Sequence, residues 1–145
     1  MNRINKANIL VMQVIPGLLM LLFFYTAFSK LMDYPLFKAA LGDVPFISRF
    51  ANILAWLLPV TEIIAGGLLF HPSTRKIGLL LSLALLIVFT AYLFGMVVSG
   101  IKLPCNCGGV ISTMSWKQHL VFNAFFIILT TIAAVKYTSK NIASI

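Results

Sequence analysis

Four long apolar runs constrain the fold of this chain more than any other feature of its sequence. They cover about residues 8–28, 52–70, 77–98 and 116–135. Each is close to the ~20 residues that a helix needs to cross the ~30 Å hydrocarbon core of a bilayer. An open strand in lipid would leave its backbone N–H and C=O groups unpaired, so we expect helices. The sequence therefore predicts an all-α fold, an integral membrane four-helix bundle, as a single transmembrane domain over residues 1–145.

The composition supports a lipid environment. Of the 145 residues, 61% are hydrophobic and only 10% are charged. A soluble domain carries about a quarter of its residues as charged side chains. A chain this short has a high ratio of surface to volume, so a water-soluble fold would need far more polar cover. We therefore expect membrane lipid to contact most of the surface.

Basic residues outnumber acidic ones by eleven to three, which gives a net charge of +8. On a soluble protein this imbalance would suggest nucleic acid. Here the basic residues flank the apolar runs, where they set orientation in the membrane, so nucleic-acid binding is not expected.

The flanking charges also predict the topology. Four spans bring both termini to one side, which carries six of the basic residues against five on the other. The positive-inside rule then predicts cytoplasmic termini. The first run exceeds the 7–15 apolar residues of a signal-peptide core, so we expect it to be retained as a span.

The only two cysteines, Cys105 and Cys107, are one residue apart in the sequence PCNCGG at residues 104–109. A disulfide between them would close a small ring, which strains the preferred geometry. Strained disulfides tend to be labile or catalytic. A structural disulfide would stabilise little across so short a loop. With cytoplasmic termini, the pair would lie on the outer, oxidising face of the membrane.

Two other interpretations of the cysteines stay open. They can be an inert pair in an apolar setting. They can also bind Cu(I) together with His119, because soft thiolates suit that ion. A zinc site is not predicted, because it needs about four ligands and a wider cysteine spacing.

Two charged residues belong to the first two apolar runs or their ends. Glu62 is the only acidic residue inside a run. An ionisable group within the membrane usually faces the bundle interior and marks a pathway or a partner. Glu62 is therefore expected either to pair with a polar group or to accept a proton beside a bound quinone. Lys30 follows the first run on the cysteine side, where it would either favour a thiolate or extend to the lipid headgroups.

The sequence predicts where the helix of the fourth run begins. Ser115 and Gln118 have the spacing of a capping box. His119 then lies about one turn inside the helix, and Asn123, four residues on, shares its face. His119 is a candidate neighbour of the thiols. Asn123 is expected to form interhelical hydrogen bonds, and the aromatic residues are expected to pack or to face lipid.

Several of these pieces, in this order, resemble the MauE branch of the DoxX-like membrane proteins. They are residues 28–31 (FSKL), 58–62 (LPVTE), 75–78 (RKIG), 105–108 (CNCG) and 115–119 (SWKQH), followed by Asn123. The resemblance spans nearly the whole chain. It departs from the familiar form at Gly108, where a Phe usually follows the second cysteine.

The resemblance implies a four-helix bundle of the bacterial inner membrane that handles thiols during maturation of exported proteins, often beside a thioredoxin-like partner. Relatives in the wider group include a quinone-linked oxidoreductase subunit. We therefore expect a thiol–disulfide oxidoreductase, or the membrane component of one, in which Cys105 and Cys107 exchange electrons. His119 and Lys30 would assist, and Glu62 and Asn123 would contact a membrane quinone. The rival hypotheses are a non-catalytic subunit that anchors a larger complex and a copper-handling membrane protein.

Overall fold

A computed structural model describes residues 10–100 and 115–142, and all regular structure in these two segments is helical. This confirms the predicted all-α membrane bundle. The elements in chain order are the π-helix η1 (Leu10–Val14), α2 (Ile15–Met32), α3 (Tyr34–Gly42), the 3₁₀ turn η2 (Ser48–Phe50), α4 (Ala51–Phe70), α5 (Arg75–Ser99) and α7 (Trp116–Ile142).

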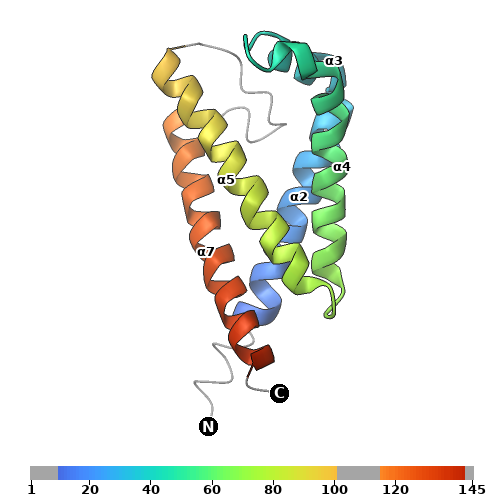
Figure 1. Ribbon diagram of the computed structural model, residues 1–145, viewed down its shortest axis with the longest axis vertical. Coiled ribbons are helices and arrows are strands. Elements are labelled where there is room, and N and C mark those ends of the chain that lie inside the picture. The colour runs from blue at the N-terminus through green and yellow to red at the C-terminus, as the bar shows by residue number, and fades with distance from the viewer. Residues whose placement is uncertain (1–9, 101–114, 143–145) are drawn as a thin grey trace.

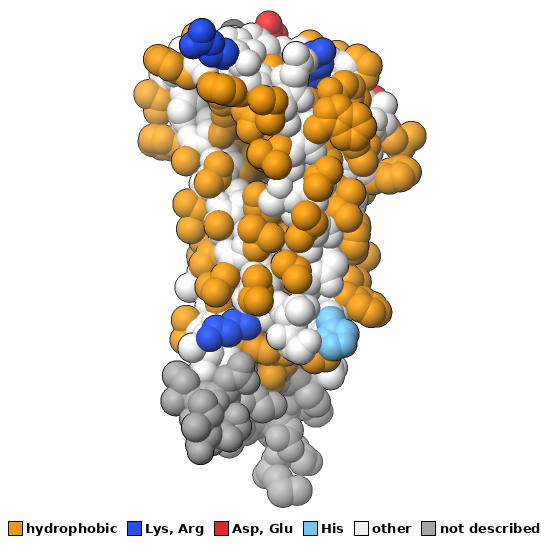
Figure 2. Space-filling model, turned by 45° about the vertical axis from the view of Figure 1, so that its right-hand side comes forward, with side chains coloured by type: hydrophobic (Ala, Val, Ile, Leu, Met, Phe, Trp, Pro, Cys, Tyr) orange, Lys and Arg blue, Asp and Glu red, His pale blue; other side chains and the backbone are white. Residues whose placement is uncertain are grey.

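Four helices are long and apolar enough to cross a membrane. The corresponding spans are Val11–Met32, Ser48–Phe70, Arg75–Ser99 and Lys117–Thr138. The first helix runs four residues past the predicted limit, because Lys30 near its end is buried and not at the water boundary. Figure 2 shows a belt of hydrophobic side chains between charged groups at the two ends. The chain is therefore a multi-pass membrane protein whose belt contacts lipid.

Helix α3 is the longest described element that the sequence did not predict. Pro35 lies in its first turn, where the missing N–H is not needed. Phe37 and Leu41, one turn apart, are buried against the start of α4 with Ala51 and Ala55. Its amphipathic pattern is short, and a charged residue interrupts it, so it resembled a loop in the sequence.

The four long helices form two antiparallel pairs (Figure 1). Helices α2 and α4 make one pair, α5 and α7 the other, and α4 also packs along α5. At one end lie the start of η1, the end of α7 and the short turn between α4 and α5, and we call this the termini end. At the other lie α3, the end of α5 and the start of α7, and we call this the α3 end.

The main apolar core lies towards the termini end. Leu19, Leu79 and Ala133, from α2, α5 and α7, are fully buried in it. Gly78 allows α4 and α5 to approach closely there: a Cβ atom at this position would lie 2.9 Å from the backbone nitrogen of Leu69. The small residue therefore fixes how the two helices are aligned.

Arg75 ties the helices together at the termini end. Its Nε donates to the Leu69 carbonyl of α4 at 3.0 Å. Its Nη1 donates to the Met12 carbonyl at 3.0 Å and to the Tyr137 hydroxyl of α7 at 3.4 Å. The last carbonyls of a helix lack partners within the helix and attract cations, so Arg75 satisfies the end of α4.

Candidate functional site

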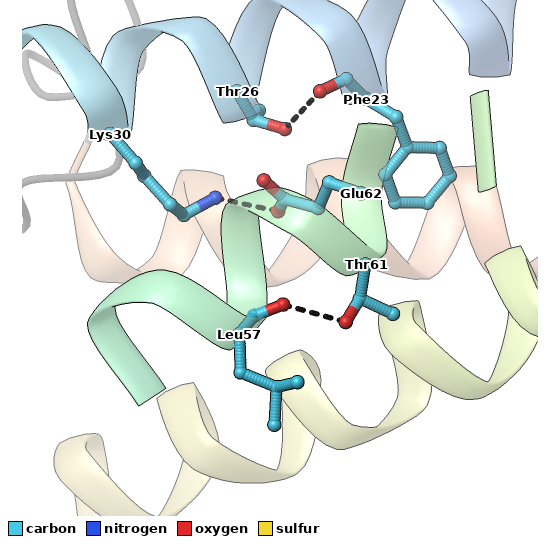
Figure 3. A network of polar contacts seen from close by, with 6 residues as sticks. All are labelled: Phe23, Thr26, Lys30, Leu57, Thr61 and Glu62. Carbon is cyan, nitrogen blue, oxygen red and sulfur yellow. Dashed lines mark hydrogen bonds and ion pairs between the residues drawn. The ribbon is translucent and has the colours of Figure 1, made fainter. Parts of the chain in front are cut away.

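Lys30 and Glu62 form an ion pair inside the bundle (Figure 3). The Lys30 Nζ lies 2.6 Å from Glu62 Oε1, and the two side chains are only 3% and 12% exposed. The expectation that Glu62 pairs with a polar group is confirmed. The alternative in which Lys30 extends to the headgroups is wrong, because α2 directs the side chain towards α4 and a buried carboxylate neutralises it.

Two aromatic rings complete the surroundings of Lys30. Its Nζ lies 5.8 Å from the ring centroid of Phe37, on α3, and 5.8 Å from that of Phe89, on α5. A cation over the face of an aromatic ring is attracted by the ring's quadrupole, more strongly when water is excluded. Helix α3 thus covers the ion pair from the α3 end, and α5 supports it from the side.

The fourth long helix joins this cluster through His119. The rings of Phe89 and His119 have centroids 5.7 Å apart. His119 and Asn123 are each 3% exposed. The predicted capping box is confirmed: the Ser115 N–H donates to Gln118 Oε1 at 2.9 Å, and the Gln118 N–H donates to Ser115 Oγ at 3.4 Å. This cap fixes the start of α7 and so the depth at which His119 enters the bundle.

The second carboxylate oxygen of Glu62, Oε2, is not used by the ion pair with Lys30. Oε2 is buried and has no hydrogen-bond partner among the described residues. Thr26 lies beside Glu62, but its hydroxyl donates to the Phe23 carbonyl at 3.2 Å. The hydroxyl of Thr61 likewise donates to Leu57, at 2.6 Å. Glu62 can therefore accept a hydrogen bond or a proton at Oε2 while Oε1 holds Lys30.

Cys105 and Cys107 lie outside the described residues, in the segment that joins α5 to α7. That segment leaves α5 at Gly100 and re-enters the described chain at Ser115, and both positions are at the α3 end. Lys30 and His119 lie near the ends of α2 and α7 at that end, whereas Glu62 lies near the middle of α4. Contact between the thiols and His119 or Lys30 stays a prediction.

A family model described as methylamine utilisation protein MauE matches residues 8–136. The chain belongs to the MauE family. The match extends from before η1 into the last turns of α7, so it covers all four membrane helices and every candidate site residue. No curated protein and no solved structure matches the chain.

The copper hypothesis finds no ligand set in the described parts of this MauE-family chain. In residues 10–100 and 115–142, no three His, Cys, Asp or Glu side chains lie close enough together to hold a metal ion. The hypothesis depends on both cysteines, which are outside those segments.

Sequence reasoning missed the two rings that contact Lys30. Phe37 belongs to the unpredicted helix α3, and Phe89 is one of many phenylalanines expected to pack or to face lipid. Nothing in a single sequence distinguishes these two phenylalanines from the others, because the contact with Lys30 joins residues on different helices. Ser82 was also missed, although a serine that is completely buried in a membrane helix needs a polar partner.

Proposed function

We propose that this MauE-family protein exchanges electrons between Cys105 and Cys107 and the thiols of another protein, as a membrane component of methylamine utilisation. The observation that supports the proposal is the buried cluster of Lys30, Glu62 and His119. Lys30 and His119 come from the ends of α2 and α7 to which the cysteine segment is nearest, and Phe89 of α5 lies between them, while Glu62 of α4 pairs with Lys30. Ionisable groups buried at such a position in a membrane protein are characteristic of functional sites.

The exchange proceeds through a mixed disulfide. A thiolate of the partner attacks one sulfur of an oxidised Cys105–Cys107 pair, so one S–S bond forms as the other breaks. The second partner thiolate then attacks the mixed disulfide and releases both cysteines reduced. Two electrons and two protons pass from the partner to the pair, and the partner gains a disulfide.

Lys30 and His119 have supporting roles in this proposal. A basic group near a cysteine favours the nucleophilic thiolate. His119 is the candidate for exchanging the thiol proton, since it enters the bundle one turn after Ser115. Lys30 contributes positive charge that Glu62 partly compensates.

A membrane quinone is the proposed final acceptor, and Glu62 and Asn123 are its candidate contacts. The buried Glu62 Oε2 fits a hydroxyl donor, and the buried Asn123 Nδ2, which has no partner in residues 10–100 and 115–142, fits a carbonyl acceptor. A quinone would supply a two-electron acceptor that diffuses in lipid. Glu62 would hold the accompanying proton at Oε2.

The proposed location is the bacterial inner membrane with both termini in the cytoplasm, so that the α3 end faces outward. The partner is then an exported protein or a thioredoxin-like protein. Topology is tested with single cysteines in a Cys105→Ser/Cys107→Ser background. We expect a membrane-impermeant maleimide to label Phe46→Cys, at the α3 end, in intact cells. Ser73→Cys, at the termini end, should be labelled only after permeabilisation, and the reverse pattern contradicts the orientation.

Thiol trapping tests the activity. With Cys105→Ser or Cys107→Ser, one variant should accumulate a mixed disulfide with its partner that is visible on a non-reducing gel and removed by reductant. The double variant should form no adduct and should fail to support disulfide formation in the partner. Wild-type partner oxidation in the double variant would instead favour the anchoring role.

A further inference from the structure

Three buried polar atoms lack a hydrogen-bond partner within the described residues. They are Glu62 Oε2, Ser82 Oγ and Asn123 Nδ2, from α4, α5 and α7. A buried polar group without a partner loses its hydration and gains nothing in return. Native proteins therefore supply a partner, and internal water is the usual one. The relative depths of the three atoms in the bundle indicate whether the same water could bind all of them.

The contact at Gly78 aligns α4 with α5. Gly78 packs against Leu69, and both helices run from there towards the α3 end. At 1.5 Å per residue, Ser82 lies about 6 Å from this contact and Glu62 about 10 Å from it. The two residues therefore lie within one helical turn of each other in depth.

The contact between Phe89 and His119 aligns α5 with α7. Phe89 lies about 16 Å from Gly78 along α5, and Asn123 lies about 6 Å deeper than His119 along α7. Asn123 is thus at the depth of Glu62. Ser82 is two turns from Phe89 and Asn123 one turn from His119, so they share the faces on which these rings meet. All three atoms lie in one layer about a helical turn thick.

We propose that this layer holds internal water bound to Glu62 Oε2, Ser82 Oγ and Asn123 Nδ2, and that this water exchanges a proton with Glu62. Water donates to the carboxylate oxygen and accepts from the amide, so one or two molecules satisfy all three atoms. A hydronium ion gives its proton to Oε2, which leaves a neutral carboxyl group and a water molecule. The reverse transfer restores the carboxylate that pairs with Lys30.

Among the described residues, the layer has apolar neighbours towards one end of the bundle and polar ones towards the other. Towards the termini end, the fully buried Leu19, Leu79 and Ala133 fill the core. Thr130 is also buried there, but its hydroxyl donates to the Phe126 carbonyl of its own helix at 2.7 Å. Towards the α3 end lie Lys30 and His119. The proposed route of protons to Glu62 therefore runs past Lys30 and His119, from the side that carries the cysteine segment.

The water site belongs to the protein without bound quinone, since a quinone that contacts Glu62 and Asn123 would displace this water. The use of the proton rests on the proposed function, whereas the water site does not: two-electron transfer from thiols to a quinone also moves two protons, and Glu62 holds one of them. The test is made in a Cys105→Ser/Cys107→Ser background, so its result is independent of thiol exchange. Failure of thiol trapping and failure of the water site are thus separate outcomes.

The first experiment lowers the pH until the Glu62 carboxyl group is protonated and then measures its deuterium exchange by infrared spectroscopy, in the full chain in lipid nanodiscs. The band of the protonated carboxyl group is assigned by its loss in Glu62→Gln. We expect exchange in the parent protein and at least tenfold slower exchange with Ser82→Ala/Asn123→Leu added. Thr130→Val, which removes a hydroxyl that already has a partner, should not alter the rate. A parent that does not exchange, or a double variant that exchanges at the parent rate, overturns the proposal.

A second experiment needs no substitution in the layer. Radiolytic oxidation in isotopically labelled water marks buried side chains that lie beside internal water. Leu86, on the face of α5 between Ser82 and Phe89, should be oxidised several-fold more than Leu19, a fully buried residue of the same apolar cluster that lies farther towards the termini end. Equal labelling of the two leucines would overturn the water site.

Discussion

The two ends of the bundle bury a basic side chain in opposite ways. At the α3 end, Lys30 meets one carboxylate and two aromatic rings. At the termini end, the half-buried Arg75 donates to two backbone carbonyls and a phenol. In the described residues no carboxylate contacts Arg75.

The partners of Arg75 and of Lys30 suit different roles, one structural and one chemical. Backbone carbonyls cannot take up a proton near neutral pH, and they are present whatever the side chains, so Arg75 is a structural tie. Its planar guanidinium matches acceptors on several helices at once, which a lysine cannot do. The charge of Lys30 instead depends on one side chain, Glu62, which can be removed or protonated. We therefore expect the cluster around Lys30 to be the more sensitive to the loss of a single side chain.

The largest effect is expected when the ion pair is broken. Lys30→Met leaves the Glu62 carboxylate buried without its cation, which should lower the free energy of unfolding by about 3–5 kcal/mol. Adding Glu62→Met should recover most of the loss, because an apolar pair can replace a buried ion pair. Unfolding in detergent measures both, with Lys38→Met, at an exposed position, as the control. If Lys30→Met is as stable as Lys38→Met, the ion pair does not contribute to stability in the way proposed here.

The Lys30→Met/Glu62→Met variant also separates stability from function. It should fold and insert into membranes, yet lose most partner oxidation in the thiol assay, because its charge and proton acceptor are gone. Full activity in this variant would assign the ion pair a purely structural role.

At the termini end, Arg75→Gln should cost about 2–3 kcal/mol, as expected for hydrogen bonds made by a charged donor. Arg75→Lys should recover only part of this, since it cannot reach all three acceptors. Neither variant should reduce thiol exchange at a temperature at which it stays folded. Lys76→Gln, at the exposed neighbouring position, is the matched control. Loss of thiol exchange in a folded Arg75→Gln variant would show that Arg75, like Lys30, is needed for function.

The tight helix contact at the termini end predicts a cost of about 1–3 kcal/mol for Gly78→Ala, because the new methyl group would overlap the α4 backbone. Gly95→Ala, in the same helix with nothing within 4 Å of the added Cβ, should be neutral or stabilising by up to about 1 kcal/mol. Thermal unfolding midpoints of the two variants compare them directly. Equal midpoints would mean that the close approach at Gly78 is not needed.

The smallest effect is expected at the start of α7. Ser115→Ala removes one cap hydrogen bond and should cost about 1 kcal/mol. Faster amide hydrogen exchange in the first turn of α7 would report it, with little change at the termini end. Gln118→Glu keeps the acceptor and should preserve protection. Unchanged exchange in Ser115→Ala would show that packing around His119 alone holds this helix start.

The sequence predicted those features that depend on local pattern and on solvent. The four spans follow from apolar length, because only helices satisfy their own backbone in lipid. The cap at Ser115 follows from residue spacing, and the expectation of a partner for Glu62 follows from the cost of a buried charge. The cysteine chemistry is likewise a prediction from spacing, and it rests on residues outside the described segments.

Only the tertiary structure decided which groups meet. Lys30 could have extended to the headgroups or towards a thiol, and the packing of α2 against α4 brought it to Glu62. The roles of helix α3, of the two phenylalanine rings and of the Ser82 hydroxyl likewise depend on neighbours on other helices. In an apolar sequence most positions look alike, because lipid and core favour the same residues. Helix packing therefore determines which of the few polar groups can reach one another.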